Sequence, residues 1–379
     1  MTRVRLRTPR RAGRTARTGT GSFSPRRAVA TSALGVLAAA ALVGPAFATP
    51  AHAATPQYKL TIVGSAGTEL FGINKNGDAF GIADEKGAKT QDGFLLAAGT
   101  TKMLFLGSPG DPSNTNSFSS PEGFNSSDDV VGTATSLSTG NADPVEWKDS
   151  ATPTNLGTLP GLQNLVASPE LTSVNDNGLI TGFGSNRGDI GFTINGSTVT
   201  KLPALPSGGV DVEPIAVNNS GLIVGQADTT TSDFQAAEWQ NGTITALGML
   251  PGSLTSEALA VNSSGEAVGA DVETSDSDAH AVLFANGKVT DLNAPGTGTA
   301  GGDAVANAIN DNGVIVGQGG NGDAFVYQNG QATDLNTLIA PGSGFTLLNA
   351  DGINANGVIV GTASNSNGQR FGFELAPVS

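Results

Sequence analysis

Carboxylates gathered in one short stretch are the side chains of this sequence whose types and spacing best suit metal chemistry. Calcium in proteins is bound by oxygen ligands, many of them from carboxylates. The stretch contains Asp271, Glu273, Asp276 and Asp278. Their spacing matches no calcium-binding loop that we recognise, so a solvated acidic loop is the favoured interpretation and a calcium site is the alternative. No other cofactor is indicated.

Other residues with catalytic potential are few. The chain has no cysteine and 2 histidines, which excludes thiol nucleophiles, cysteine-ligated metals and three-histidine metal sites. His280 occupies the repeat position that Gln235 and Asp323 hold in other copies, so we interpret it as structural and expect no Ser-His-Asp triad. Paired carboxylates for glycoside hydrolysis stay open, because 33 acidic residues offer many pairs. The sequence nominates no catalytic residue.

Two further motifs have structural interpretations. Arg187-Gly188-Asp189 spells a cell-adhesion tripeptide, but such triplets are common by chance and Asp189 falls near a repeat position. Residues 175–178 and 310–313 both read Asn-Asp-Asn-Gly and are similar to calcium loops, yet both coincide with predicted turns. We therefore expect neither adhesion nor calcium binding at these places.

One sequence motif recurs seven times along the chain. Each copy has an asparagine after an apolar residue and a later glycine in an apolar run, and six of the seven also have a glycine three residues after the asparagine. The lead asparagines are Asn74, Asn125, Asn175, Asn218, Asn262, Asn310 and Asn354. They are 43 to 51 residues apart, a period typical of four-stranded propeller blades.

The motif consists of residue types that form a tight turn. Asparagine can bond to the backbone two residues on, and the glycine can take the left-handed conformation that closes a short hairpin. The turn glycines are Gly77, Gly178, Gly221, Gly265, Gly313 and Gly357, with Asp128 in the second copy. The second glycine lies within a predicted strand, where it permits close backbone approach as blades crowd toward an axis. These glycines are Gly81, Gly132, Gly182, Gly225, Gly269, Gly317 and Gly361.

Each unit continues with an aromatic residue, and several units then have an Asn-Gly hairpin signal. The aromatic residues, Trp147, Phe192, Trp239, Phe284, Tyr327 and Phe373, are interpreted as core between blades rather than as a sugar-stacking platform. The last unit lacks a fourth strand, and residues 58–64 supply a spare one. We predict an all-β fold, a seven-bladed β-propeller of four-stranded antiparallel blades, closed where residues 58–64 pair with the strand around residues 371–375.

At this level of detail the sequence resembles a known family. His280-Ala281-Val282-Leu283-Phe284, followed by Asn286-Gly287 and Asp291-Leu292, has a counterpart in residues 323–335. The pattern is similar to the HAF-repeat family of extracellular proteins, over essentially all of residues 54–379, with the first two repeats degenerate. The resemblance implies secretion and a repeat fold. It brings no catalytic residues.

Residues 1–53 have the features of a secretory signal. They contain nine of the 19 basic residues and no acidic one, and an alanine-rich apolar stretch leads to Ala51-His52-Ala53. We predict cleavage after Ala53, which leaves residues 54–379 as one propeller domain. Arg26-Arg27 resembles a twin-arginine signal, so that route and the general one both stay open, and a retained membrane anchor is the lesser alternative.

The chain that remains is acidic, with 10 basic against 33 acidic residues. Nucleic acid is therefore not an expected partner, and we expect no stable membrane span after cleavage. We predict a secreted protein, monomeric, whose ligand is an extracellular polymer, a protein or a small molecule.

Propeller connectivity predicts two unlike faces. The short turns within blades share one face, whereas the loops from second to third strands and the connections between blades share the other and vary in length. Variable loops are where ligands usually bind. Their acids are Asp84, Glu85, Asp111, Glu122, Asp228, Asp233, Asp271, Glu273, Asp276 and Asp278. We predict a binding module that uses this irregular acidic face; a polysaccharide hydrolase or lyase and a structural cell-envelope protein are the alternatives.

Overall fold

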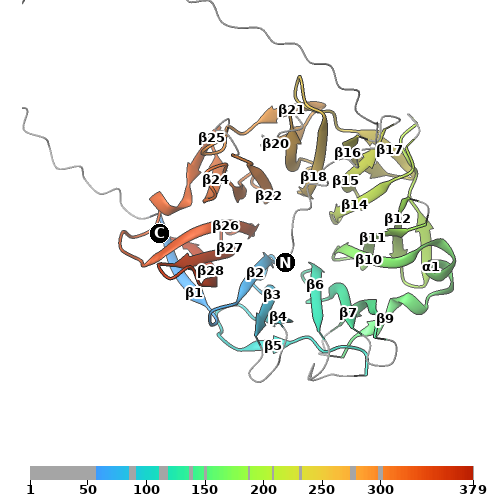
Figure 1. Ribbon diagram of the computed structural model, residues 1–379, viewed down its shortest axis with the longest axis horizontal. Helices are drawn as coiled ribbons and strands as arrows, with labels where there is room; N and C mark the ends of the chain where they lie inside the picture. Colours follow the sequence, from blue (N-terminus) through green and yellow to red (C-terminus); the bar gives the residue numbers. More distant parts are fainter. Residues whose placement is uncertain are drawn as a thin grey trace, which may run out of the picture. The chain divides into compact units, whose positions relative to one another are not determined.

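Seven four-stranded antiparallel sheets form a ring in the computed structural model (Figure 1). The structure describes residues 57–378 except 85–90, 111–117, 136–139, 149–151, 187, 207–208, 230–232, 274–278 and 298–301. The predicted leader and its cleavage site at Ala53 lie outside these residues. The all-β fold, the number of blades and the number of strands in each blade are all confirmed.

The first four blades follow chain order. Blade 1 contains β2 (Glu69–Ile73), β3 (Ala79–Asp84), β4 (Gln91–Leu96) and β5 (Met103–Phe105). Blade 2 contains β6 (Ser119–Phe124), β7 (Val130–Thr135), β8 (Ala142–Trp147) and β9 (Thr154–Asn155). Blade 3 contains β10 (Ala167–Val174), β11 (Leu179–Ser185), β12 (Asp189–Asn195) and β13 (Thr198–Lys201). Blade 4 contains β14 (Val212–Val217), β15 (Ile223–Asp228), β16 (Phe234–Gln240) and β17 (Thr243–Ala246).

The remaining blades end with the one that joins both ends of the described chain. Blade 5 contains β18 (Thr255–Val261), β19 (Ala267–Val272), β20 (Ala279–Ala285) and β21 (Lys288–Asp291). Blade 6 contains β22 (Val305–Ile309), β23 (Ile315–Gln318), β24 (Ala324–Gln328) and β25 (Gln331–Asp334). Blade 7 contains β26 (Phe345–Ile353), β27 (Ile359–Asn365), β28 (Arg370–Pro377) and β1 (Tyr58–Val63).

Three short helices interrupt the strands of the described chain: two 3-10 turns, Leu156–Thr158 and Leu335–Thr337, and α1 (Pro160–Leu165). Proline suits the first position of a helix because its missing N–H would have no partner there. Leu162 is buried in the core between blades 2 and 3. The sequence predicts only a connecting loop between these blades, so α1 is a local departure from the prediction.

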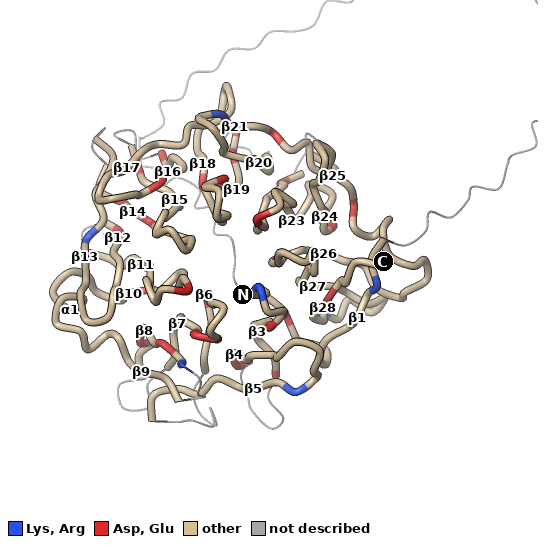
Figure 2. Tube along the Cα trace, turned by 180° about the vertical axis from the view of Figure 1, so that it is seen from behind, with Lys and Arg blue, Asp and Glu red and all other residues tan. Residues whose placement is uncertain are grey.

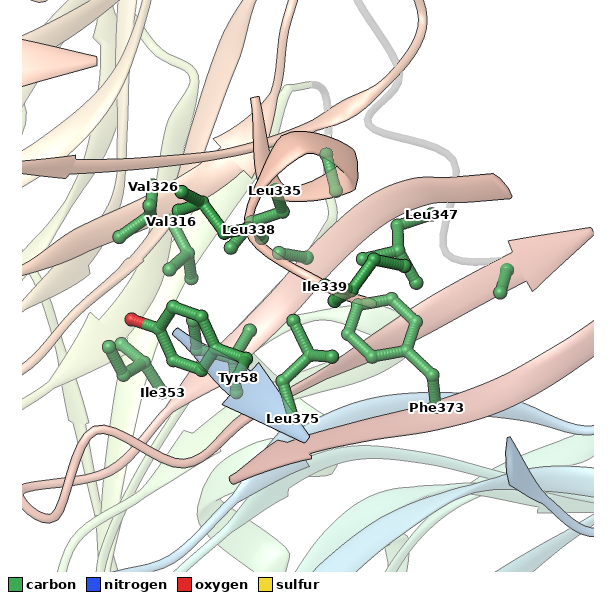
Figure 3. Packing of buried hydrophobic residues seen from close by; sticks show 14 residues of the cluster. Tyr58, Val316, Val326, Leu335, Leu338, Ile339, Leu347, Ile353, Phe373 and Leu375 are labelled. Carbon is green, nitrogen blue, oxygen red and sulfur yellow. The ribbon is translucent and has the colours of Figure 1, made fainter. Parts of the chain in front are cut away.

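The ring closes as predicted. In blade 7, β1 pairs antiparallel with β28, with Ile62 opposite Phe373 and Leu60 opposite Leu375. Tyr58, Phe373 and Leu375 belong to a buried cluster that extends to Leu335 and Leu338 of blade 6 (Figure 3). The Leu338 carbonyl also accepts the backbone N–H groups of Gln57 and Tyr58. The first strand of the chain thus holds together its last blade and the blade before it.

The repeat asparagines make the predicted turn. In all seven copies, the side-chain oxygen accepts the backbone N–H groups two and four residues later; for Asn218 these belong to Ser220 and Leu222, at 3.0 and 3.1 Å. The turn glycine takes a left-handed conformation, with φ of +81° at Gly221. Asp128 takes the same conformation at φ +61°, which most non-glycine residues avoid.

The same asparagines also join neighbouring blades, a role that is not predicted from the sequence. The side-chain amide of each donates to the backbone carbonyl of the equivalent asparagine in the next blade, as from Asn175 to Asn218 at 2.9 Å and from Asn218 to Asn262 at 2.9 Å. Six such bonds run from blade 1 to blade 7. Within the described residues, the junction from blade 7 back to blade 1 lacks this bond. We call the six bonds the asparagine relay.

Asn218→Ala separates the two roles of the repeat asparagine. The substitution removes the partner of the Ser220 and Leu222 N–H groups, of which that of Leu222 is buried, and one of the two hydrogen bonds to the Asn262 carbonyl, which still accepts from Gly265. We therefore expect the free energy of unfolding to fall by about 3 kcal/mol. Asn365→Ala is the matched control. Asn365 makes the same turn in blade 7, with bonds from Asn367 and Gln369, but its amide bonds only within that turn. Equal losses for both variants in urea denaturation would show that the relay contributes nothing.

The second glycine of each repeat faces a β-bulge in its own blade. Gly225 pairs with Pro214, after which the register of β14 shifts so that Ile215 is the extra residue. A Cβ atom on Gly225 would collide with the carbonyl oxygen of Glu213. The six equivalent glycines face the same bulge. Close backbone approach is therefore confirmed, and its cause lies within each blade rather than between blades.

The aromatic residues of the repeats pack in the core. Trp147, Phe192, Trp239, Phe284 and Phe373 are buried, and Tyr327 packs against the cluster shared by blades 5 and 6. The two tryptophans also donate to the backbone that connects blades, at Gly107 and Pro203. Their interpretation as core between blades is confirmed.

Candidate functional site

The first strand of each blade lies nearest the axis (Figure 1), and these seven inner strands carry six carboxylates. Two positions of the repeat hold them. Glu69, Glu170, Glu213 and Glu257 come five residues before a repeat asparagine, and Glu122 and Asp351 come three residues before. Figure 2 shows acidic residues at the inner ends of several blades. The candidate site is this set, which we call the axial carboxylates.

The bulge determines which way some of these residues lie. In blades 2 and 7, the extra residue of the bulge is Glu122 or Asp351. The equivalent residue of blade 6, Asn307, donates to the Asn349 side chain and the Ala350 carbonyl of blade 7, at 2.7 and 3.1 Å. The bulge residue therefore contacts the neighbouring blade, consistent with the way bulges re-aim side chains beside functional sites.

The axial carboxylates form three pairs, each across a junction between blades. Burial, aided by the charge of Glu213, raises the pKa of Glu257 to about 7. Burial and the charge of Glu69 raise the pKa of Asp351 to about 8. Burial raises the pKa of Glu122 to about 7, with the charge of Glu170 acting in the same direction and a hydrogen bond from Ser120 acting against it. Like charges at each junction therefore favour a retained proton.

The hydrogen-bond partners of these groups differ. Glu213 Oε2 accepts from the Gln226 side chain at 2.8 Å. Asp351 Oδ1 accepts from Asn349 at 2.6 Å. By contrast, Glu257 is only 8% exposed and its Oε1 has no hydrogen-bond partner among the described residues. A buried polar atom without a partner costs about 1–3 kcal/mol, which marks Glu257 as the carboxylate most in need of a donor.

Some of the acidic residues that were predicted to lie in loops lie in strands. Glu122 was assigned to a connection between blades, whereas the structure places it within β6. This assignment was wrong because the inner strand of blade 2 continues through these residues, with Pro121 paired to Gly132 and Glu122 as the extra residue of its bulge. Asp84, Asp228 and Asp271 lie near the ends of second strands, and Asp233 lies in a loop. Glu85, Asp111, Asp276 and Asp278 fall outside the described residues.

Asp271 and Glu273, the two calcium candidates within the described part of the chain, interact with other protein groups. Asp271 is fully buried and its Oδ2 accepts the backbone N–H of Leu250 at 2.9 Å. Glu273 Oε1 lies 3.7 Å from His280 Nε2. Across the described chain, no three His, Cys, Asp or Glu side chains are grouped so that they could hold a metal ion. Asp276 and Asp278, which would complete the proposed set, are outside the described chain.

His280 and Asp189 have structural partners. His280 Nδ1 lies 2.8 Å from Asp291 Oδ2, on the neighbouring strand of blade 5. Among the described residues, no serine hydroxyl bonds to its ring, so the geometry is not that of a triad. Asp189 is buried in β12 and accepts from Ser185, which is unsuited to adhesion; Arg187 falls outside the described residues.

Comparison with known proteins yields structural likeness alone. No protein-family model and no curated protein matches the sequence. The fold is similar to TolB from Acinetobacter baumannii, with 13% identity and a TM-score of 0.43, over 84% of this chain and 65% of that one. It is also similar to a fungal alcohol oxidase solved with copper, with 12% identity, a TM-score of 0.49, and coverage of 85% and 76%. A putative TolB from Agrobacterium tumefaciens gives 11% identity, a TM-score of 0.43, and coverage of 86% and 100%.

The sequence contains a signal for the axial carboxylates that is not among the predictions above. Glutamate stands five residues before the repeat asparagine in four of the seven copies. Aligning the copies on Asn74, Asn175, Asn218 and Asn262 reveals it, but only the ring shows that these positions come together.

In the described chain, no helix has the length and apolar character needed to span a membrane.

Proposed function

We propose that this chain is a secreted binding module that takes its ligand where the irregular loop face meets the axis. The observation that carries the proposal is the set of axial carboxylates, above all Glu257 with its unpartnered oxygen. Purely structural strands seldom bury such groups, because each costs free energy unless something binds it. Relationship to the HAF-repeat family and export by the leader are parts of the same proposal.

A ligand screen tests the proposal. Residues 54–379 are applied to a glycan array and to immobilised extracellular proteins and peptides, with and without calcium, and soluble polysaccharides are assayed for hydrolysis. We expect binding without turnover, and weaker binding after Glu257→Gln. Absence of binding in every arm would favour the structural cell-envelope alternative. Sequencing the amino terminus of protein from the culture medium tests export, with Ala54 expected as the first residue.

One observation favours a hydrolase or lyase as the second candidate. Glu257 retains its proton near neutral pH, because burial and Glu213 raise its pKa to about 7, and a protonated acid beside a second carboxyl group is the pairing that glycoside hydrolysis uses. Turnover that disappears in both Glu257→Gln and Glu213→Gln, with polysaccharide binding retained, would replace the binding module with this enzyme.

A further inference from the structure

The extra residue of the inner-strand bulge, three residues before the repeat asparagine, can bond to the next blade. Asn307 of blade 6 donates to Asn349 Oδ1 of blade 7 at 2.7 Å, and to the Ala350 carbonyl at 3.1 Å. Thr172 of blade 3 donates to the Pro214 carbonyl of blade 4 at 2.9 Å. Ala350 and Pro214 both come four residues before the repeat asparagine of their own blade. We call this bond from a bulge side chain to the next inner strand the bulge tie.

Blade 7 has an aspartate at this position. Asp351 is the extra residue of the β26 bulge, and the residues of blade 1 that correspond to the partners of Asn307 are Glu69 and Leu70. The charge of Glu69 acts on Asp351, as this correspondence requires. Arg370 donates to Glu69 Oε1 at 3.4 Å, so Glu69 is an acceptor at the junction between blades 7 and 1. Asp351 can therefore form the bulge tie only as a donor, and for that it needs its proton.

The surroundings of Asp351 favour the protonated carboxyl group at neutral pH. Burial and the charge of Glu69 raise the pKa of Asp351 to about 8, although a hydrogen bond from Asn349, at 2.6 Å, acts against them. The elements that pack most closely against β26 are β2, β22, β23, β24, β27 and the turn Leu335–Thr337. Their titratable side chains are Glu69 and Tyr327. Asp351 is partly exposed, so water can take its proton as the pH rises through 8.

We propose that the protonated carboxyl group of Asp351 is the bulge tie between blades 7 and 1, and that this junction loosens when the proton leaves. The O–H of Asp351 donates to the Glu69 carboxylate or to the Leu70 carbonyl. Once the proton has gone to water, two carboxylates are left at the junction with no donor between them. This is also the junction at which the described residues lack the relay bond, so no asparagine bond compensates for the loss. The device is separate from the proposed binding function and makes the integrity of the ring depend on pH.

Glu122 of blade 2 provides the comparison within the same chain. It holds the same bulge position, and burial raises its pKa to about 7. The junction between blades 2 and 3, however, has its relay bond, from Asn125 to the Asn175 carbonyl at 3.1 Å. We therefore expect this junction to stay closed when Glu122 ionises, and the first loosening at high pH to occur between blades 7 and 1.

Thiol labelling reports on each junction separately, because the chain has no cysteine of its own. Val360 and Val316 are fully buried, six residues after the repeat asparagines of blades 7 and 6. Val360 shares a cluster with Leu70 of blade 1, and Val316 shares one with Leu347 of blade 7. The full chain with Val360→Cys or Val316→Cys is labelled with dithiodipyridine at pH 6 and pH 9, and protection is the rate for the urea-unfolded chain divided by the rate for the folded chain. Between these pH values, we expect protection in Val360→Cys to fall at least tenfold more than in Val316→Cys, because the closed junction between blades 7 and 1 holds a proton that the open one releases.

Further substitutions in the Val360→Cys chain assign the effect to Asp351. Asp351→Asn supplies a donor at every pH, as Asn307 does in blade 6, and should preserve protection at pH 9. Asp351→Ala removes the donor and should lower protection already at pH 6, whereas Glu122→Gln is the matched control and should change protection at neither pH. Circular dichroism verifies that each variant is folded. Equal losses of protection in Val360→Cys and Val316→Cys, a loss at pH 9 that survives Asp351→Asn, or full protection of Asp351→Ala at pH 6 would each overturn the proposal.

Discussion

Removing residues 54–63 is expected to abolish cooperative folding, or to lower the unfolding temperature by well over 10 °C. The deletion takes away β1, and with it a six-residue ladder to β28. It also exposes Phe373 and Leu375, which are otherwise fully buried. The loss of several buried apolar side chains together with a strand is comparable to the stability of a whole domain, about 5–15 kcal/mol. Circular dichroism and a thermal melt of the chain from Gly64 measure it.

Point variants in β1 distinguish the effect of ring closure on stability from the effect of shortening the chain. Tyr58→Ala removes a buried side chain of the cluster between blades 6 and 7 and should cost about 3 kcal/mol. Lys59→Ala, at the exposed neighbouring position, should stay within about 0.5 kcal/mol of the parent. A synthetic peptide of residues 57–64 should restore part of the lost stability to the truncated chain. A truncated chain as stable as the parent would show that closure by β1 is unnecessary.

The free energy of unfolding should fall as pH rises from 5 to 8. Burial and the neighbouring Glu213 raise the pKa of Glu257 from 4.5 to about 7. Between these values the folded chain keeps a proton that the unfolded chain has released. The stabilisation is thus fully present below the unfolded pKa and is lost as pH rises through the folded pKa, by up to about 3 kcal/mol for this group. Asp351 and Glu122, whose pKa values are raised too, act in the same direction.

Urea denaturation of Glu257→Gln, at pH 5 and pH 8, measures this contribution. Because glutamine cannot ionise, the variant should differ little from the parent at pH 5 and be more stable than the parent at pH 8. Asp84→Asn, which alters an exposed carboxylate, should leave the pH dependence unchanged. A parent that is more stable at pH 8 than at pH 5 would contradict the prediction, as would an unaltered slope in Glu257→Gln.

Local turn chemistry and repeat spacing made the architecture predictable. Asn218 and Gly221 specify their turn with side-chain and backbone groups within five residues, so the sequence alone determines it. The Asn-Gly pairs at residues 241–242, 286–287 and 329–330 have both residues at positive φ, as expected for tight hairpins, whereas in the pair at 195–196 only the glycine does. Closure was predictable because the count of strands left one missing at the carboxyl terminus and one spare at residues 58–64.

The relay and the axial carboxylates were not predictable in the same way. The bond from Asn218 to Asn262 links residues 44 positions apart, and its geometry depends on how one blade packs against the next. The pairing of Glu213 with Glu257 likewise exists only once the inner strands are side by side. Local composition is misleading at Glu122, because proline and glycine on either side of it are typical of a loop, whereas the structure has a bulged strand there.

The asparagine relay makes the ring directional. Every blade from the second to the sixth presents a donor to one neighbour and an acceptor to the other, the head-to-tail relation that closes protein subunits into cyclic assemblies. A fragment of a few blades would therefore end in two unlike and complementary surfaces. Two such fragments could recognise each other through contacts already present in the intact chain, so splitting the protein between blades offers a route to a ring that assembles from separate pieces.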